Sequence, residues 1–211
     1  MDQALEELRE AILKGDGDLA QSAAQECLKR GLAPLQIIHE AVVPGIQQAG
    51  ELWNQGEYFI PDIVMSAEAY KAAVALIEPH LKKGSLEAPG KVVLGVVAGD
   101  MHDLGKNLVV TMMQAGQLEV VDLGVNVPVG TFVQAVKEHR PQVLGLGAYM
   151  STTMLSIRDV IAALKAEGLR EGLKIMVGGV PVTEKFAHEV GADAHGRDAI
   201  DALEKARQFL G

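Results

Sequence analysis

The sequence predicts two structural units, an all-helical bundle followed by an α/β unit with a parallel five-stranded sheet. Up to about His80 the apolar residues recur with helical spacing, and no segment makes a convincing strand. From Lys91 onward, short apolar runs alternate with helical patterns. We therefore expect a four-helix bundle in residues 1–88 and a doubly wound α/β domain in residues 89–211.

The composition is that of a folded protein with a sizeable core. Of the 211 residues 48% are hydrophobic, and no apolar run approaches the roughly 20 residues that a membrane-spanning helix needs. The formal net charge of −9 argues against nucleic acid or a membrane as a partner, because both attract an excess of Lys and Arg. The N-terminus lacks the pattern of a secretion signal, so we expect a cytoplasmic protein. The single cysteine, Cys27, is expected to pack in the core.

The helical unit is expected to contain four helices joined by short turns. They are predicted at about residues 5–14, 19–30, 34–53 and 61–77. Gly31 follows the second helix, at the position where glycine commonly ends one. Pro44 lies inside the third helix and should kink it, because proline has no N–H and its ring clashes with the preceding turn.

A segment rich in proline, glycine and charge, Pro79–Gly90, is interpreted as the linker to the α/β unit. Beyond it, strands are expected at residues 92–98, 119–123, 143–147, 174–177 and 192–194. Helices are expected at residues 104–114, 130–139, 151–166, 183–190 and 197–210. This alternation predicts a flavodoxin-like sheet of the Rossmann type, whose first and third strands flank the ligand-binding edge.

A polar loop follows the first of these strands. Asp100 and His102 are two residues apart, so in extended backbone both side chains leave the same side. The carboxylate can then accept the hydrogen of one imidazole nitrogen and leave the other free to bind a metal. The simpler interpretation is an exposed loop histidine, with Asp100 or Asp103 only capping the next helix.

At these residues the chain resembles the cobalamin-binding domain of corrinoid-dependent methyltransferases. The signature of that family is Asp-x-His-x-x-Gly, which Asp100, His102 and Gly105 match, and the longer family motif matches throughout Gly99–Asn107. The resemblance implies that His102 is the lower axial ligand of cobalt. It also assigns further residues of this loop to the cofactor site: Met101, Asp103 and Leu104.

The family's second motif, Ser-x-Leu, lines the nucleotide tail of the cofactor. Here Gly147 and Tyr149 stand in place of the serine and the leucine, which leaves the tail preference open. By the same offset, Thr153 falls where related proteins carry a hydroxyl that hydrogen-bonds the motif aspartate. Ser151 is either a ligand contact or the N-cap of a helix.

The family's third motif, a pair of glycines after the fourth strand, matches Gly178 and Gly179, with Val180 beside them. Paired glycines let the backbone approach a bulky ligand closely. The helical unit also carries a resemblance, to the cap of methyltransferase corrinoid proteins. Trp53 and Ile60 match the apolar residues that cover the upper face of the corrin, whereas Tyr58 and Phe59 are expected in the bundle core.

The resemblance covers nearly the whole chain and implies a methyl carrier, not a complete enzyme by itself. Its cofactor would be cobalamin, vitamin B12 or a related corrinoid, with cobalt as the reactive metal. Its partners would be a donor-specific methyltransferase, an acceptor methyltransferase acting on tetrahydrofolate or a thiol, and a reductive activase. The donor itself is chosen in the partner's active site, so this sequence does not name it.

Two other functions share part of the pattern. A cobalamin-dependent sensor or regulatory module could use the same two units, but such regulators add a DNA-binding helix-turn-helix, for which we expect no room in this acidic chain. Gly-Asp-x-His also opens the metal site of two-metal phosphoesterases. That chemistry needs further ligands, and the remaining histidines form no matching motif.

Overall fold

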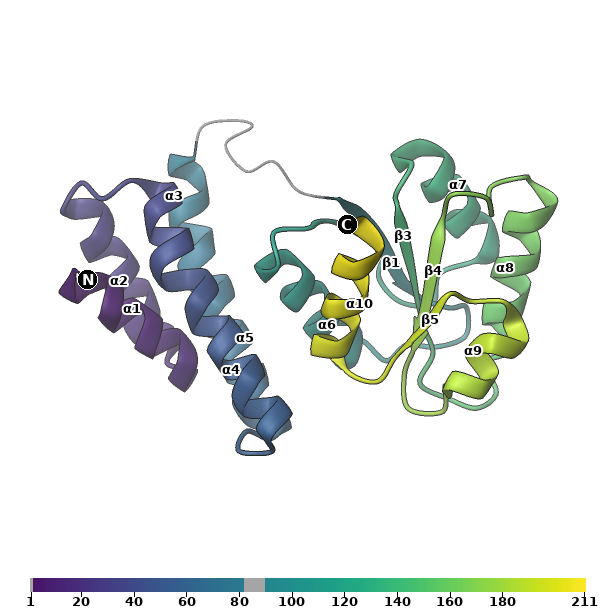
Figure 1. The fold of residues 1–211 in the computed structure, drawn as a ribbon, viewed down its shortest axis with the longest axis horizontal. Helices are drawn as coiled ribbons and strands as arrows, with labels where there is room; N and C mark the ends of the chain where they lie inside the picture. The colour runs from purple at the N-terminus through teal and green to yellow at the C-terminus, as the bar shows by residue number, and fades with distance from the viewer. Residues whose placement is uncertain (1, 82–89) are drawn as a thin grey trace. The chain divides into compact units, whose positions relative to one another are not determined.

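The structure, a computed structural model, describes residues 2–81 and 90–211. The chain divides into two compact units, Met1–Glu87 and Ala88–Gly211 (Figure 1). Most of the predicted linker, residues 82–89, lies outside the described residues, as does the expected boundary between residues 88 and 89.

The first unit is helical, as predicted. Its helices are α1 (Gln3–Lys14), α2 (Gly17–Lys29), α3 (Pro34–Ile37), α4 (Val43–Gln55) and α5 (Ile60–Ile77), followed by the 3₁₀ turn η2 (Glu78–His80). Leu5, Leu8 and Ile12 on one face of α1 are fully buried. Gly31 follows α2 with φ +79°, in the left-handed region that favours glycine. Cys27 is fully buried, and burial raises the pKa of its thiol to about 11, as expected of a packed core residue.

The irregularity expected at Pro44 is a π-helical turn. The turn η1 (Ile38–Val42) joins α3 to α4, and Pro44 occupies the first turn of α4. A proline ring needs extra room against the preceding turn and donates no hydrogen bond to it. The wider π turn directly before Pro44 provides that room, so α3, η1 and α4 follow one another without a break.

Phe59 corrects one expectation for the bundle core. Its side chain is 67% exposed because it stands at the N-cap of α5, outside the helix, where its N–H donates to Oδ2 of Asp62 at 2.8 Å. Tyr58 is half-buried, and its hydroxyl donates to the carbonyl of Leu13 at 2.9 Å. Trp53 is half-buried near the end of α4, and Ile60, the first residue of α5, is 57% exposed.

The second unit contains the predicted five-stranded parallel sheet. Its strands are β1 (Lys91–Val96), β2 (Glu119–Asp122), β3 (Val143–Gly147), β4 (Lys174–Gly178) and β5 (Ala194–Gly196), in the order β2-β1-β3-β4-β5. Its helices are α6 (Leu104–Ala115), α7 (Val129–His139), α8 (Ser156–Ala166), α9 (Glu184–Val190) and α10 (Ala199–Leu210). The strand order reverses between β1 and β3, which places the ligand-binding edge at the ends of these two strands.

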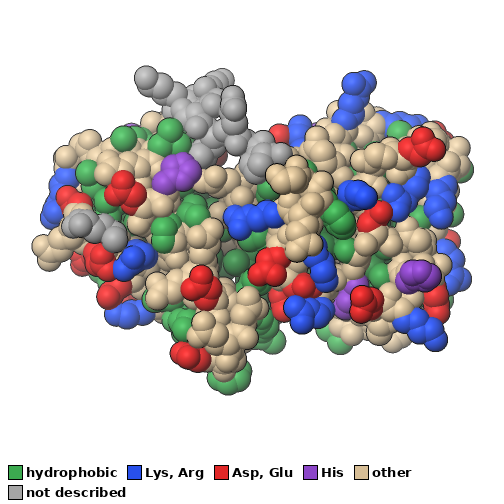
Figure 2. Space-filling view, viewed as in Figure 1, with side chains coloured by type: hydrophobic (Ala, Val, Ile, Leu, Met, Phe, Trp, Pro, Cys, Tyr) green, Lys and Arg blue, Asp and Glu red, His purple; other side chains and the backbone are tan. Residues whose placement is uncertain are grey.

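Helices cover both faces of this sheet (Figure 1). Helices α6 and α10 pack on one face over a core that includes Leu94, Met113 and Leu203. Helices α7, α8 and α9 cover the other face, around Phe132 and Leu144. The β-branched run of β1 is buried on both sides, as its composition predicts. On the face drawn in Figure 2, basic and acidic side chains of this unit are interspersed.

Several predicted boundaries shift by one or two residues in the structure, and that of α8 shifts further. Helix α8 begins at Ser156, five residues later than expected, because the preceding residues form a tight turn in which Thr153 and Met154 both donate their N–H to the carbonyl of Met150, at 3.1 and 3.0 Å. Strand β5 starts at Ala194, since Asp193 is engaged by β4: its carboxylate accepts the N–H of Ile175 at 2.7 Å.

Candidate functional site

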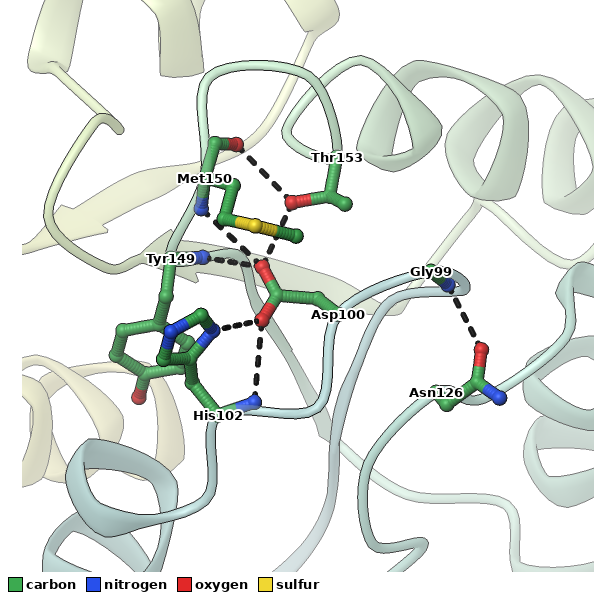
Figure 3. A network of polar contacts seen from close by, with 7 residues as sticks. All are labelled: Gly99, Asp100, His102, Asn126, Tyr149, Met150 and Thr153. Atoms are coloured by element: carbon green, nitrogen blue, oxygen red, sulfur yellow. Dashed lines mark hydrogen bonds and ion pairs between the residues drawn. The ribbon is translucent and has the colours of Figure 1, made fainter.

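The polar loop between β1 and α6 begins with a turn. The N–H of Asp100 donates to the carbonyl of Val97 at 3.2 Å, and Gly99 within the turn has φ +83°. Glycine adopts this backbone conformation without the steric cost that a side chain would add. The turn directs the side chain of Asp100 back toward the end of β3 (Figure 3).

The carboxylate of Asp100 is fully buried and accepts hydrogen bonds from two segments of the chain. Its Oδ1 lies 2.7 Å from Nδ1 of His102 and also accepts the N–H of His102 at 3.2 Å. Its Oδ2 accepts the N–H of Tyr149 at 2.7 Å, the N–H of Met150 at 3.2 Å and the hydroxyl of Thr153 at 2.6 Å. The loops after β1 and β3 are thus joined through one buried carboxylate (Figure 3).

These contacts decide the protonation of Asp100. Burial alone would raise its pKa, but hydrogen bonds from the Thr153 hydroxyl, the Tyr149 N–H and His102 hold the pKa well below its usual range. An ionised carboxylate only accepts, so Nδ1 of His102 donates to it, and a neutral imidazole held in this way has its lone pair on Nε2. The His102 side chain is 59% exposed, so the imidazole can offer one oriented nitrogen to a metal.

Tyr149 packs beside this histidine. The two ring centroids are 5.9 Å apart, with an angle of 39° between the ring planes. A Cβ on Gly105 would lie 2.5 Å from the Tyr149 hydroxyl oxygen, so only glycine at the start of α6 lets the phenol ring take this place. Burial, with the charges of Asp100 and Asp103, raises the pKa of Tyr149 to about 12, which keeps the phenol protonated.

Large apolar side chains are exposed on three segments at the same edge of the sheet as His102. They lie on the segments that follow β1, β3 and β4: Met101 (67% exposed), Leu104 (58%), Met150 (36%), Leu155 (52%) and Val180 (88%). Exposed apolar side chains gathered around a few polar groups are typical of a site for a mostly apolar ligand.

A row of glycines crosses the ends of three neighbouring strands. Gly147 of β3 pairs in register with Gly178 of β4, which pairs with Gly196 of β5. A Cβ on Gly196 would contact Ala202 of α10 at 3.3 Å, so the row lies on the face covered by α6 and α10. A Cβ on the next residue, Gly179, would lie 1.9 Å from the carbonyl oxygen of Ala148. The backbone ends of these strands therefore present no side chains on this face.

The structure brings most residues of the predicted site together. His102, Tyr149 and Thr153 surround Asp100, and the hydrogen bond implied between Thr153 and Asp100 is present. The helix-capping alternatives are not observed. Asp103 stands at the N-cap of α6 without a side-chain hydrogen bond to it, and Ser151 is an exposed turn residue that does not cap α8.

Two residues of this region were not predicted. Gly196 joins the glycine row only through strand pairing, which the sequence does not display. Asn126, between β2 and α7, accepts the N–H of Gly99 on its side-chain Oδ1 at 2.7 Å. Its φ of +52° is uncommon outside glycine, and asparagine tolerates it better than most residues, so an asparagine in a glycine-containing loop was the available signal.

Within residues 2–81 and 90–211, no group of three or more His, Cys, Asp and Glu side chains is placed to hold a metal ion. A two-metal hydrolase needs such groups, whereas a metal that enters with its own equatorial ligands needs one protein nitrogen. No helix in the described part of the chain has the length and apolar character needed to cross a membrane.

Comparison with known proteins places both units in one family. A model described as a B12 binding domain matches residues 90–204, and a second model with the same description matches residues 4–78. A corrinoid protein of Desulfitobacterium hafniense (strain Y51) is 38% identical, over 98% of this chain and 97% of its own. Dimethylamine corrinoid protein 1 of Methanosarcina mazei is 40% identical, over 99% of this chain and 97% of its own.

A solved structure agrees with these relatives. A chain of the methanol:cobalamin methyltransferase complex MtaBC from Methanosarcina barkeri aligns with a TM-score of 0.87 and 29% identity. The alignment covers 99% of this chain and 80% of that chain.

Proposed function

Because this chain belongs to the family of corrinoid proteins with B12-binding domains, we propose that it carries a methyl group on a cobalamin whose lower cobalt ligand is His102. Its cofactor is a cobalamin, and its relatives serve methyltransferase systems. The observation that carries the proposed ligation is the 2.7 Å contact between Nδ1 of His102 and buried Asp100, which leaves Nε2 of this exposed side chain as the nitrogen that can bind a metal.

The residues present fit a corrinoid. A corrinoid brings most of the ligands of its own cobalt, so a site with one oriented imidazole, that of His102, would be sufficient to hold the metal. The exposed apolar side chains on the segments after β1, β3 and β4 suit the broad face of a macrocycle, and burying them there would remove apolar surface from water.

The glycine row suits the nucleotide tail of the cofactor. Gly147 and Gly178 carry no side chain on the face covered by α6 and α10, and a Cβ on Gly147 would meet nothing closer than 3.4 Å. We propose that the tail lies along this row, with Tyr149 and Gly105 beside its entry. The serine hydroxyl of related proteins is missing at Gly147, so the tail is recognised here by shape more than by hydrogen bonds.

When bound, the cobalt supplies the centre that accepts and releases the methyl group. The protein's own contribution would be to hold one imidazole nitrogen of His102 where a metal can bind it. Asp100 holds the hydrogen of Nδ1 and so fixes which nitrogen of His102 faces the metal. Thr153 in turn orients the carboxylate. Trp53 and Ile60 are proposed to shield the methyl-bearing face, as the resemblance implies.

The partners follow from the relatives. These relatives include a dimethylamine corrinoid protein and a chain of a methanol:cobalamin methyltransferase complex, and we propose that this chain likewise receives a methyl group from a donor-specific methyltransferase. An acceptor methyltransferase using tetrahydrofolate or a thiol, and a reductive activase, complete the proposed system. A sensor or regulatory role would need the cobalamin site but no methyl transfer.

The deciding experiment is reconstitution of the purified protein with hydroxocobalamin. Wild type, His102→Ala and the control His188→Ala, which changes an exposed histidine on α9, are passed through gel filtration and their visible spectra recorded. We expect all three to retain cobalamin and only His102→Ala to lose the histidine-ligated spectrum. An unchanged spectrum in His102→Ala, or loss of cobalamin from the wild type, would refute the proposal.

A second assay separates a carrier from a sensor. The reconstituted protein is reduced and supplied with dimethylamine, trimethylamine or methanol together with the matching methyltransferase. Methyl transfer with any of these pairs supports the carrier role and names the donor. Tight cobalamin binding without transfer from any donor would favour the sensor.

A further inference from the structure

Asn126 holds the main chain of the loop that carries His102 (Figure 3). Its side-chain Oδ1 accepts the N–H of Gly99 at 2.7 Å, and its own N–H donates to the carbonyl of Asp100 at 2.9 Å. One residue between β2 and α7 thus binds two consecutive residues of the loop after β1.

The main chain of Gly99 and Asp100 depends on few contacts besides these. Gly99 has φ +83°, and a glycine can leave such a conformation more readily than any other residue. Only the 3.2 Å hydrogen bond from Asp100 to Val97 closes the turn from within. Asn126 adds an outside partner, and its own φ is +52°, a conformation that asparagine tolerates better than most residues.

Asp100 is therefore fixed from two directions. Its carboxylate is held by Tyr149, Met150 and Thr153 of the loop after β3. Its main chain is held by Asn126 of the loop after β2. Strand β1 lies between β2 and β3, so Asp100 is bound by the loops that follow the two neighbouring strands.

We infer that Asn126 is a positioning residue for His102, acting through the main chain of Gly99 and Asp100. Asn126 fixes the position of the Asp100 main chain, and that position sets the geometry of the hydrogen bond between Oδ1 of Asp100 and Nδ1 of His102. This hydrogen bond in turn decides which imidazole nitrogen remains available to a ligand. The effect on the imidazole exists without cofactor. The effect on cobalt ligation rests on the proposed function.

Three substitutions separate the contributions of Asn126. Asn126→Ala removes the side-chain acceptor and places an unsuited residue at positive φ. Asn126→Gly removes the acceptor but keeps the backbone conformation and the N–H to Asp100. Asn126→Asp keeps an acceptor for Gly99 at the same position and serves as the conservative control.

The first readout is the tautomer of His102 in the protein without cofactor. The chain has 6 histidines, so the signals of His102 in long-range ¹H–¹⁵N spectra are identified by their loss in His102→Ala. We expect the Nδ1–H form in wild type and Asn126→Asp. In Asn126→Ala and Asn126→Gly we expect a rise in the Nε2–H form of about threefold to tenfold, the size set by one lost hydrogen bond.

The second readout is the nitrogen splitting in the electron paramagnetic resonance spectrum after reconstitution with hydroxocobalamin and one-electron reduction. The histidine-ligated fraction should fall in Asn126→Ala and Asn126→Gly and stay near wild type in Asn126→Asp. Wild-type tautomer and ligation in the Ala and Gly variants would overturn the inference and leave Asn126 a purely structural residue. If the wild type binds no cobalamin, the proposed function fails, while the tautomer comparison still decides the role of Asn126.

Discussion

The hydroxyl oxygen of Thr153 lies 2.6 Å from Oδ2 of Asp100, although the two residues are 53 positions apart in the sequence. The same hydroxyl lies 3.0 Å from the carbonyl of Met150. It has one hydrogen, and the shorter contact to a charged acceptor shows where that hydrogen goes. The turn after β3 is therefore built around a donor for the aspartate of the loop after β1.

Replacing Thr153 with valine should destabilise the protein by about 1–3 kcal/mol, because a buried carboxylate loses one of its donors. Thr153→Ser keeps the hydroxyl and is the matched control. Urea unfolding without cofactor measures the free energy of unfolding of the valine and the serine variant. If the valine variant unfolds at the same urea concentration as the serine variant, the hydroxyl contributes nothing to holding Asp100.

Lys106 of α6 and Asp122 of β2 form an ion pair, and removing one partner should destabilise the protein more than removing the other. Lys106 is 4% exposed, whereas the Asp122 side chain is 34% exposed. Asp122→Asn leaves a buried ammonium without a charge partner and should cost about 3 kcal/mol. Lys106→Met leaves a carboxylate that still reaches water and should cost about half as much.

Thermal unfolding of both single variants and of the double variant tests this asymmetry. The double variant should be more stable than Asp122→Asn alone, since it removes the stranded charge. Equal losses in the two single variants would show that the burial of Lys106 does not govern the energetics of the pair.

Two glycines at the site should differ sharply in their tolerance of a methyl group. Gly179→Ala should cost at least about 2 kcal/mol, because the residue has φ +118° and a Cβ would lie 1.9 Å from the carbonyl oxygen of Ala148. Gly147→Ala should change stability by less than about 1 kcal/mol, since its Cβ would make only ordinary contacts from 3.4 Å. Chemical denaturation measures the free energy of unfolding of the two alanine variants. An equal loss in both would contradict the geometry described for the ends of β3 and β4.

Asp201 should contribute to the loss of stability in acid. Burial alone would raise its pKa, but hydrogen bonds from the Arg197 N–H, from Lys205 and from the Arg197 side chain lower it below the ordinary value of 3.8. A carboxyl whose folded pKa is lowered stabilises the protein above its unfolded pKa, and this stabilisation disappears as the pH falls through the folded value.

Unfolding free energies of wild type and Asp201→Asn between pH 6 and pH 2 measure this contribution. The difference between the two proteins should be roughly constant above about pH 5 and should shrink below about pH 4. A difference that stays the same throughout this range would show that Asp201 titrates alike in the folded and unfolded chain.

Much of the fold could be predicted because the spacing of apolar residues in the sequence agrees with their burial in the structure. The β-branched run of β1 is buried on both faces, and regular alternation with helices leaves a parallel sheet as the consistent arrangement. The start of α8 could not be predicted, because residues near Thr153 have helical character but bond to Asp100 and Met150 instead. Local propensity does not contain such distant partners.

The site shows the same division. His102 and Asp100 could be paired from their spacing and from resemblance, since both lie in one short loop. Asn126 and Gly196 could not, because their roles come from pairing between separate strands and loops. Phe59 was misplaced because an apolar residue at a helix cap looks the same in sequence as one in the bundle.

Within the described residues, the hydrogen bonds that orient the His102 imidazole come from the loops after β1, β2 and β3 of one unit. The α/β unit therefore contains by itself all of these contacts. Under the proposed function, the helical unit and any surface that meets a methyltransferase are free to change in evolution without altering these hydrogen bonds. Relatives with different methyl donors would then share the way in which His102 is held.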